Sequence, residues 1–248
     1  RGLAALKKSG VEVVGYSETS ISMACWGLSW AANHQDIKVL AFMPKYKHRQ
    51  PPLLEYHRSM WEALGAETRP IEKPSRGSIN FYRSRAILRD EFGDRAQMIV
   101  MGMPFPETTL ETTKQVLLTP ELADCRSLVI NIGSGVICAG VLKGIDSKYP
   151  GMVKVYGVAA RYYDSSRSIN SRTDVVHWKA GLVKGGLLGP LFQFANTRHE
   201  YTAPCEVEAP FPCNPFYDKK AWEWLVNNYD DIEKPVMFWN IGAGGVVP

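Results

Sequence analysis

Apolar and polar residues follow one another along the chain in a pattern that predicts alternating strands and helices. Runs rich in β-branched residues, such as VEVVGY at 11–16 and IKVLAFMP at 37–44, are typical of strands. Between these runs, residues 21–34 place apolar side chains at helical spacing, which predicts a helix with one apolar face. Short connections between alternating elements are typical of βαβ units, so the pattern predicts a largely parallel sheet.

The alternation continues as far as residue 160. Helices are predicted at 2–8, 53–67, 78–93, 106–118 and 135–145, and strands at 67–72, 96–102, 126–133 and 152–160. We expect the 67–72 strand at a sheet edge, because Pro70 has no N–H to donate to a ladder. Residues 161–215 show no clear periodicity and are expected to form a long loop. A loop of this length in a compact domain is usually functional or mobile. A helix at 217–229 and a strand from 234 complete the pattern.

This order of elements predicts an α/β fold with two lobes, each a three-layer αβα arrangement around a mostly parallel sheet. We expect an N-terminal lobe at 1–118 and a C-terminal lobe at 119–248. The chain has 248 residues, of which 45% are hydrophobic, so it can bury one large core or two modest ones. No apolar run reaches the roughly 18 to 20 residues that cross a bilayer, and a cytoplasmic protein without a membrane partner is expected.

Charge and cysteine content narrow the chemistry only slightly. The formal net charge is +4, but lysine and arginine are spread along the chain, so nucleic acid is not an expected partner. The five cysteines are scattered without a CxxC pair and are predicted to be reduced and mostly buried thiols. The five histidines are also dispersed, and no metal site is expected.

Three turns lie where ligands bind in parallel α/β folds, at the carboxyl ends of predicted strands. They are Ser17 to Ser22, Gly133 to Gly135 and Gly242 to Gly245. The first two lead into helices, whose N-terminal N–H groups can hold a carboxylate or a phosphate. Together the three turns fit one elongated charged ligand. Taken singly, each is also compatible with plain helix capping or a tight turn. GSGVICAG is not a GxGxxG dinucleotide fingerprint, because its third glycine comes late.

The order of several segments resembles a known family. The segments are SGVEVVGYSETSISMACWGLSWAANHQDIKVLAFMP, WEALGAE, LVINIGSGVICAGVLKG, VYGV and NPFYDKKAWEWL. They are similar to the pyridoxal-phosphate (PLP) enzymes of fold type II, the tryptophan-synthase-β-like superfamily, over nearly the whole chain except 161–205. The resemblance implies PLP as cofactor, a small amino acid as substrate and a homodimer.

The resemblance also assigns the first two turns. The first would hold the substrate carboxylate through Thr19, Ser20 and Ser22, with Ile21 and Ser22 departing from the usual Ser-Gly-Asn. The second would cradle the cofactor phosphate through Gly133, Ser134, Gly135, Val136 and Ile137. The family commonly has Gly-Thr where this chain has Val136 and Ile137, so one hydroxyl contact is missing and backbone donors must compensate. Gly242, in the third turn, is expected to contact the cofactor as well.

NPFYDKKAW is similar to the Tyr-(Asp/Glu)-Gly-Lys segment of 1-aminocyclopropane-1-carboxylate (ACC) deaminase and D-cysteine desulfhydrase, with Lys219 in place of the glycine. The match would place Tyr217 near the substrate and Asp218 at the pyridine nitrogen. A carboxylate there keeps that nitrogen protonated and makes the ring a stronger electron sink. Tyr217 and Asp218 would also serve as an ordinary helix start, with Asp218 favoured by the helix dipole.

The resemblance implies a lyase or deaminase that works by carbanion chemistry, with elimination or replacement at Cβ or Cγ. The family's Schiff-base lysine would lie just upstream of Arg1, and Lys7 and Lys8 are poor substitutes for it. One alternative is a non-catalytic ligand-binding or scaffold protein that retains this fold. A further alternative is a PLP enzyme that acts on a modified nucleotide or base.

Overall fold

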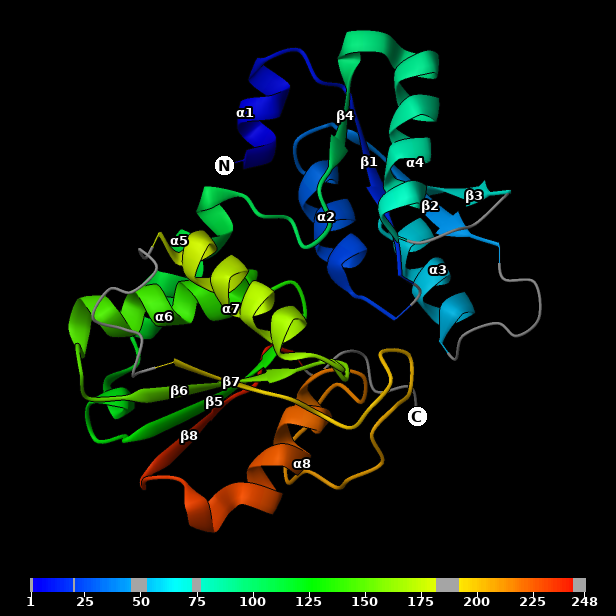
Figure 1. The fold of residues 1–248 in the computed structure, drawn as a ribbon. Coiled ribbons are helices and arrows are strands. Elements are labelled where there is room, and N and C mark those ends of the chain that lie inside the picture. The colour runs from blue at the N-terminus through cyan, green and yellow to red at the C-terminus, as the bar shows by residue number, and fades with distance from the viewer. Residues whose placement is uncertain (1, 20, 46–52, 73–76, 182–191, 243–248) are drawn as a thin grey trace. The chain divides into compact units, whose positions relative to one another are not determined.

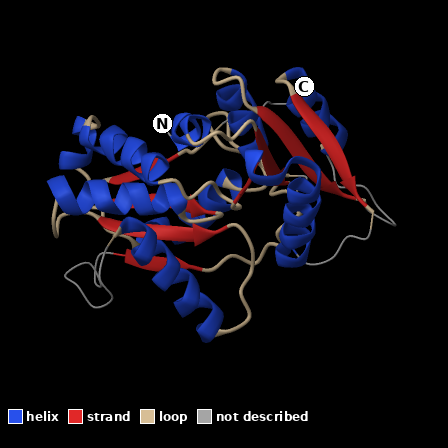
Figure 2. Ribbon diagram, turned by 90° about the horizontal axis from the view of Figure 1, so that it is seen from above, coloured by secondary structure: helices blue, strands red, loops and turns tan. Residues whose placement is uncertain are grey.

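The described part of the chain forms two four-stranded parallel sheets, each with helices on its two faces (Figures 1 and 2). The computed structural model describes residues 2–19, 21–45, 53–72, 77–181 and 192–242. The chain divides into two units, Arg1–Met103 and Pro104–Pro248. The predicted α/β fold with two parallel sheets is therefore confirmed.

The first unit contains α1 (Gly2–Lys8), β1 (Val13–Ser17), α2 (Ala24–Asn33), β2 (Lys38–Pro44), α3 (Leu54–Ala63), β3 (Ala66–Ile71), α4 (Gly77–Phe92) and β4 (Ala96–Ile99). The strand order is β3-β2-β1-β4, and Val13 of β1 is in register with Lys38 on one side and Ala96 on the other. β3 is an edge strand, as its proline predicted. The chain runs outward from β1 to β3 and then returns to the other side of β1.

That return determines where the helices lie. Because crossovers between parallel strands are right-handed, a reversal of direction moves the next helix to the opposite face of the sheet. Accordingly, α4 buries Leu88 on the face that carries Val13, Leu40 and Phe42. A ligand site is expected outside the carboxyl ends of the two strands at such a reversal, here β1 and β4.

The second unit repeats this topology. It contains α5 (Pro106–Leu117), β5 (Ser127–Ile132), α6 (Val136–Lys148), β6 (Lys154–Ala159), α7 (Ser166–Ala180), β7 (Phe192–Ala195), α8 (Asp218–Asn228) and β8 (Val236–Trp239). The order is β7-β6-β5-β8, so the reversal lies between β5 and β8. α6 and α7 cover one face of the sheet and α8 covers the other (Figure 1).

The pleat of β5 explains how one strand serves both faces. Leu128, Ile130 and Ile132 pack against α6 and α7, whereas Val129 packs against Ala221 of α8. All six residues of β5 are buried, including the polar Ser127 and Asn131, which is the reason its sequence is mostly apolar and does not alternate. The five cysteines of the chain are free and buried, as expected. Among the described residues, no helix has both the length and the apolar character needed to cross a membrane.

Residues 161–215 differ from the long loop that the sequence predicts. They include helix α7 and strand β7. α7 buries only Val176 and Ala180, so its sequence carries almost no apolar periodicity. It begins at Ser165, whose side chain accepts a hydrogen bond from the N–H of Ser168 at 3.3 Å. β7 is a four-residue edge strand, too short to give a pattern. The sequence is rich in glycine at 181–190, and of this stretch only Gly181 belongs to the described residues.

The unit boundary also differs from the predicted division at 118/119, because α5 belongs to the second unit. α5 buries a face of threonines and one valine against α6, and the Thr113 hydroxyl donates to the carbonyl of Gly140 at 3.1 Å. Gly140 and Gly144 let the two helices approach closely. A Cβ at Gly140 would lie 2.5 Å from Thr112 Cβ, and one at Gly144 would lie 2.6 Å from Val116 Cβ.

We predict that Gly140→Ala lowers the free energy of unfolding by about 1 to 3 kcal/mol, because the new methyl group collides with α5. The matched control is Gly27→Ala in α2, where nothing lies within 4 Å of the added Cβ. That change should raise stability by up to about 1 kcal/mol through helix propensity alone. Urea unfolding followed by circular dichroism measures both. Stabilisation by both substitutions would contradict the tight contact between α5 and α6.

Candidate functional site

The turn after β1 is closed by its own acidic residue. Glu18 is 2% exposed, and its two carboxylate oxygens accept hydrogen bonds from the N–H groups of Thr19 and Cys25, both at 3.0 Å. Cys25 lies in the first turn of α2, so Glu18 satisfies a donor that the helix itself leaves open. Burial raises the pKa of Glu18 to about 8, against the smaller lowering effect of the two backbone hydrogen bonds. The carboxyl group is therefore mostly protonated at neutral pH.

The residues predicted to bind a substrate carboxylate lie in this same turn. Ser22 accepts a hydrogen bond from the N–H of Ala24 at 3.1 Å, which makes it part of the start of α2. Thr19 contributes its N–H to Glu18, and Ile21 is fully buried. Ser20 lies outside the described residues. Substrate binding by Thr19, Ser20 and Ser22 stays a prediction.

The turn after β5 is built differently, because its side-chain contact to the helix start is a long one, from the N–H of Val136 to the Ser134 hydroxyl at 3.5 Å. Gly135 precedes α6 and makes no side-chain capping bond, and the first turn of α6 holds no acidic residue. Gly135 has a φ of +81°, and a Cβ there would lie 2.9 Å from Val176, so only glycine fits without strain. Val136 is buried and Ile137 packs against the core. The backbone N–H groups of this helix start are the donors that remain for an anion.

Two cations from α7 flank this turn. Arg172 donates from Nη2 to the carbonyl of Gly133 at 2.9 Å, and Lys179 donates from Nζ to the carbonyl of Ser134 at 2.5 Å. Burial and the Arg172 charge lower the pKa of Lys179. Burial raises the pKa of the Tyr163 hydroxyl, but hydrogen bonds and charge from Arg161 and Arg172 outweigh it and lower the pKa overall. The electrostatic potential at the turn is therefore positive, which suits a phosphate.

The start of α8 lies beside the same turn. Gly133 faces the ring of Tyr217, since a Cβ there would lie 3.4 Å from Tyr217 Cε1. Asp218 is 2% exposed, and its Oδ1 accepts a hydrogen bond from the N–H of Ile241 at 3.3 Å. Burial raises the pKa of Asp218 to about 6, against hydrogen bonds from Ile241 and Gly242 that lower it. Four of the predicted residues, Gly133, Tyr217, Asp218 and Gly242, thus meet where β5, β8 and α8 end or begin.

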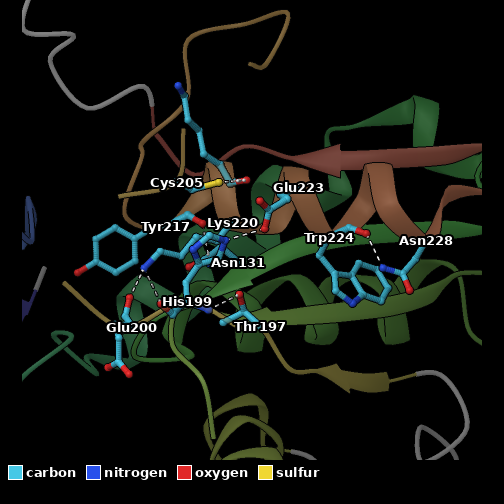
Figure 3. A network of polar contacts seen from close by, with 12 residues as sticks. Asn131, Thr197, His199, Glu200, Cys205, Tyr217, Lys220, Glu223, Trp224 and Asn228 are labelled. Atoms are coloured by element: carbon cyan, nitrogen blue, oxygen red, sulfur yellow. Dashed lines mark hydrogen bonds and ion pairs between the residues drawn. The ribbon is translucent and has the colours of Figure 1, made fainter. Parts of the chain in front are cut away.

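Two further side chains, from Tyr201 and Asn131, bond Tyr217, and a third, from Lys220, bonds the segment that carries Tyr201; none was predicted from the sequence. The hydroxyl of Tyr201 lies 2.8 Å from that of Tyr217. Asn131 of β5 donates to the Tyr217 carbonyl at 2.9 Å (Figure 3). Lys220, fully buried, donates to the carbonyls of Ala160, Glu200 and Tyr201 at 2.9, 2.9 and 3.1 Å. Burial is the main cause that lowers the pKa of Lys220 to about 8.

The sequence held signals for some of these residues. Glu18 is an acidic residue directly after a buried strand, a position at which side chains cap helices or bind ligands. Asn131 is a polar residue inside a mostly apolar strand. Lys220 falls on the lysine of the Tyr-(Asp/Glu)-Gly-Lys segment. Tyr201 has no such signal, because it lies in an irregular stretch without periodicity.

The second unit fits pyridoxal phosphate on these observations. Its glycine turn offers the N–H groups of a helix start beside two cations, as a phosphate ester requires. A buried aspartate lies nearby, as a pyridinium nitrogen requires. Fold and turn together define a PLP-dependent enzyme of fold type II.

Comparisons with known proteins give the same class. The chain is 32% identical over 253 residues to the "Glycyl-dTMP PLP-dependent decarboxylase" of Pseudomonas phage M6, covering 98% of this chain and 86% of the relative. The protein belongs to the PLP-dependent enzyme family of this relative. No family model matches the chain.

Solved structures show the same fold. An ACC deaminase homologue superposes with a TM-score of 0.74 at 16% identity, covering 97% of this chain and 76% of the other. A threonine deaminase from T.th. superposes with a TM-score of 0.64 at 14% identity, covering 95% and 80%. The resemblance to fold type II PLP enzymes is confirmed, and so is the cofactor.

We predict that the stability of the protein falls as the pH rises from about 5 to 8, because over that range the unfolded chain loses the Glu18 proton that the folded protein still holds. In the folded protein its pKa is raised above the ordinary value of 4.5, so the folded state binds the proton more tightly than the unfolded state. The loss is at most about 1.4 kcal/mol per pH unit.

The variant Glu18→Gln should flatten this pH dependence, as measured by urea unfolding at several pH values. The exposed Glu12, paired with Arg95, supplies the control Glu12→Gln, which should retain the slope. An unchanged slope in Glu18→Gln would show that Glu18 is not the titrating group.

Proposed function

We propose that this protein is a PLP-dependent decarboxylase whose substrate is an amino acid unit carried on a thymidine nucleotide. The observation that carries the proposal is the 32% identity to the phage M6 glycyl-dTMP decarboxylase over 98% of the chain. Decarboxylation breaks the bond from Cα to the carboxylate, releases CO₂ and places a proton on Cα. This differs from the elimination or replacement at Cβ or Cγ that the sequence suggested, but it uses the same carbanion chemistry.

The residues of the second unit suit this reaction. PLP, when bound, supplies an electron sink that stabilises negative charge at Cα. The N–H groups at the start of α6 would hold the phosphate, with Arg172 and Lys179 supplying positive charge. Asp218, with a pKa of about 6, is mostly ionised at neutral pH and would keep the pyridine nitrogen protonated. Tyr217, hydrogen-bonded to Tyr201, is the hydroxyl best placed beside the glycine turn to deliver a proton.

A second candidate function is a lyase or deaminase of a small free amino acid. It is favoured by the fold similarity to the ACC deaminase homologue and by the Tyr217–Asp218 pair at the start of α8. Both functions use the same cofactor contacts. They differ in the substrate and in the bond that breaks.

The first test is the product that the complete protein, loaded with PLP, releases. We expect CO₂ from glycyl-dTMP and neither ammonia nor a keto acid from ACC, D-cysteine or L-threonine. Asp218→Asn should slow CO₂ release by at least about a hundredfold, because the ring nitrogen loses its counter-charge. The control Asp230→Asn changes an exposed aspartate and should leave the rate unchanged.

Ammonia or keto acid formation from a free amino acid, without CO₂ release, would overturn the decarboxylase in favour of the second candidate. Turnover of no compound by a protein that binds PLP would favour the non-catalytic alternative.

The second test concerns the phosphate cradle and needs no catalysis. Arg172→Gln should weaken PLP binding by about tenfold or more, equivalent to about 1.4 kcal/mol, because a partly buried positive charge is lost beside the glycine turn. Arg167→Gln is the matched control, since Arg167 lies on the same helix and is exposed. Both affinities are measured by tryptophan fluorescence quenching.

Pyridoxal, which lacks the phosphate, separates an electrostatic effect from general damage. Its affinity should be the same in Arg172→Gln and the unmodified protein. An equal loss of PLP and pyridoxal binding would contradict a role of Arg172 at the phosphate.

A further inference from the structure

Three side chains with metal-binding atoms converge between the segment after β7 and helix α8. They are His199, Cys205 and Glu223, and one donor atom from each lies within 4.8 Å of the others. The Nε2 of His199 is 2.6 Å from Oε2 of Glu223. Cys205 lies beside α8, the helix that carries Glu223, and its thiol donates a hydrogen bond to the carbonyl of Lys219 at 3.5 Å. Figure 3 shows the three groups side by side.

The backbone around each donor is held firmly. The N–H of Tyr162 donates to the His199 carbonyl at 2.8 Å, and the N–H of Cys205 donates to the Pro215 carbonyl at 2.8 Å. Glu223 lies on α8 one turn after Lys220, whose three hydrogen bonds tie that helix to residues 160, 200 and 201. The three donors therefore come from backbone that is already in place, and only side-chain rotation separates them from a coordination sphere.

The donor set favours zinc. One imidazole nitrogen, one thiolate and one carboxylate oxygen are the ligand types of Zn²⁺, whereas magnesium and calcium take oxygen ligands. Ligand atoms in a tetrahedral zinc site lie about 3.3 to 3.8 Å apart, given bonds of about 2.0 to 2.3 Å. The separations of at most 4.8 Å can reach that range by small rotations. The Cys205 side chain is buried, but His199 is 21% and Glu223 38% exposed, so an ion and a fourth, water ligand have access.

We propose that His199, Cys205 and Glu223 bind one Zn²⁺, with water as the fourth ligand. On binding, the thiol of Cys205 gives up its proton to solvent, and the ion replaces the hydrogen bond between His199 and Glu223. The ion ties residues 199–205 to α8. Tyr201 lies inside that segment, so zinc keeps the Tyr201 hydroxyl against Tyr217. No metal site was expected from the sequence, because its histidines and cysteines are dispersed and match no zinc-binding spacing.

The test uses the complete protein loaded with PLP and dialysed first against chelator and then against buffer with Zn²⁺ or Co²⁺. We expect one zinc per chain by elemental analysis. With Co²⁺, we expect tetrahedral ligand-field absorption at longer wavelengths than PLP absorbs. Cys205→Ser and His199→Gln should weaken metal binding by more than about a hundredfold, because even residues that only orient ligands change affinity by about 10- to 100-fold.

Two further variants keep the result interpretable. Cys125→Ser removes another buried thiol and should leave zinc binding unchanged. Glu223→Gln keeps the size of the side chain and its hydrogen bond to His199, so it should fold, bind PLP and lose zinc. Absence of bound zinc and of cobalt absorption in the unmodified protein would overturn the proposal. Equal metal binding by Cys205→Ser, His199→Gln and the unmodified protein would overturn it as well.

Discussion

The proposed chemistry of the second unit depends on the N–H groups at the start of α6, where the Ser134 hydroxyl accepts one long hydrogen bond, from the N–H of Val136 at 3.5 Å. A helix that begins after a buried parallel strand leaves several donors without partners, and these need an anion, water or a side chain. Gly135 makes the turn sharp enough to aim them outward, and Val136 and Ile137 turn their apolar side chains toward the core. Arg172 and Lys179 then bond the carbonyls of the turn and add positive charge without blocking the donors. At the proposed phosphate site, charge from α7 would take the place of the hydroxyl that the family resemblance implies.

In the turn after β1, a side chain of the turn itself accepts hydrogen bonds from such donors. Glu18 occupies the start of α2, and burial keeps its carboxyl group mostly neutral at physiological pH. Both units have the same strand order, and both turns follow the strand at which the order reverses. The same backbone topology therefore produces two different electrostatic environments, because Glu18 bonds the donors of one turn, whereas Arg172 and Lys179 flank the other. The turn after β1 holds a mostly neutral carboxyl group that bonds its own backbone donors, whereas the turn after β5 has two cations beside it.

The pattern of apolar residues was sufficient to predict the two parallel sheets, because strands such as Ser127–Ile132 are buried on both faces and are predominantly apolar. The glycine turn and the Tyr217–Asp218 pair could also be predicted, because they lie directly at the ends of elements that the apolar pattern locates. α7 could not be predicted, because a helix that buries two small side chains leaves no periodic signal. The Tyr201–Tyr217 and His199–Cys205–Glu223 contacts depend on the path of an irregular segment. Local propensity carries no information about that path.

Lys220 lies in the same segment as Tyr217 and Asp218, and its hydrogen bonds decide whether its amine can react with the cofactor. PLP is an aldehyde that reacts with accessible neutral amines, and a lysine with a pKa of about 8 would ordinarily be a good target. Three backbone carbonyls accept hydrogen bonds from its Nζ, which leaves the nitrogen without a lone pair to attack. The protein can therefore keep an amine close to its cofactor site as a structural tie without the risk of a misplaced covalent adduct.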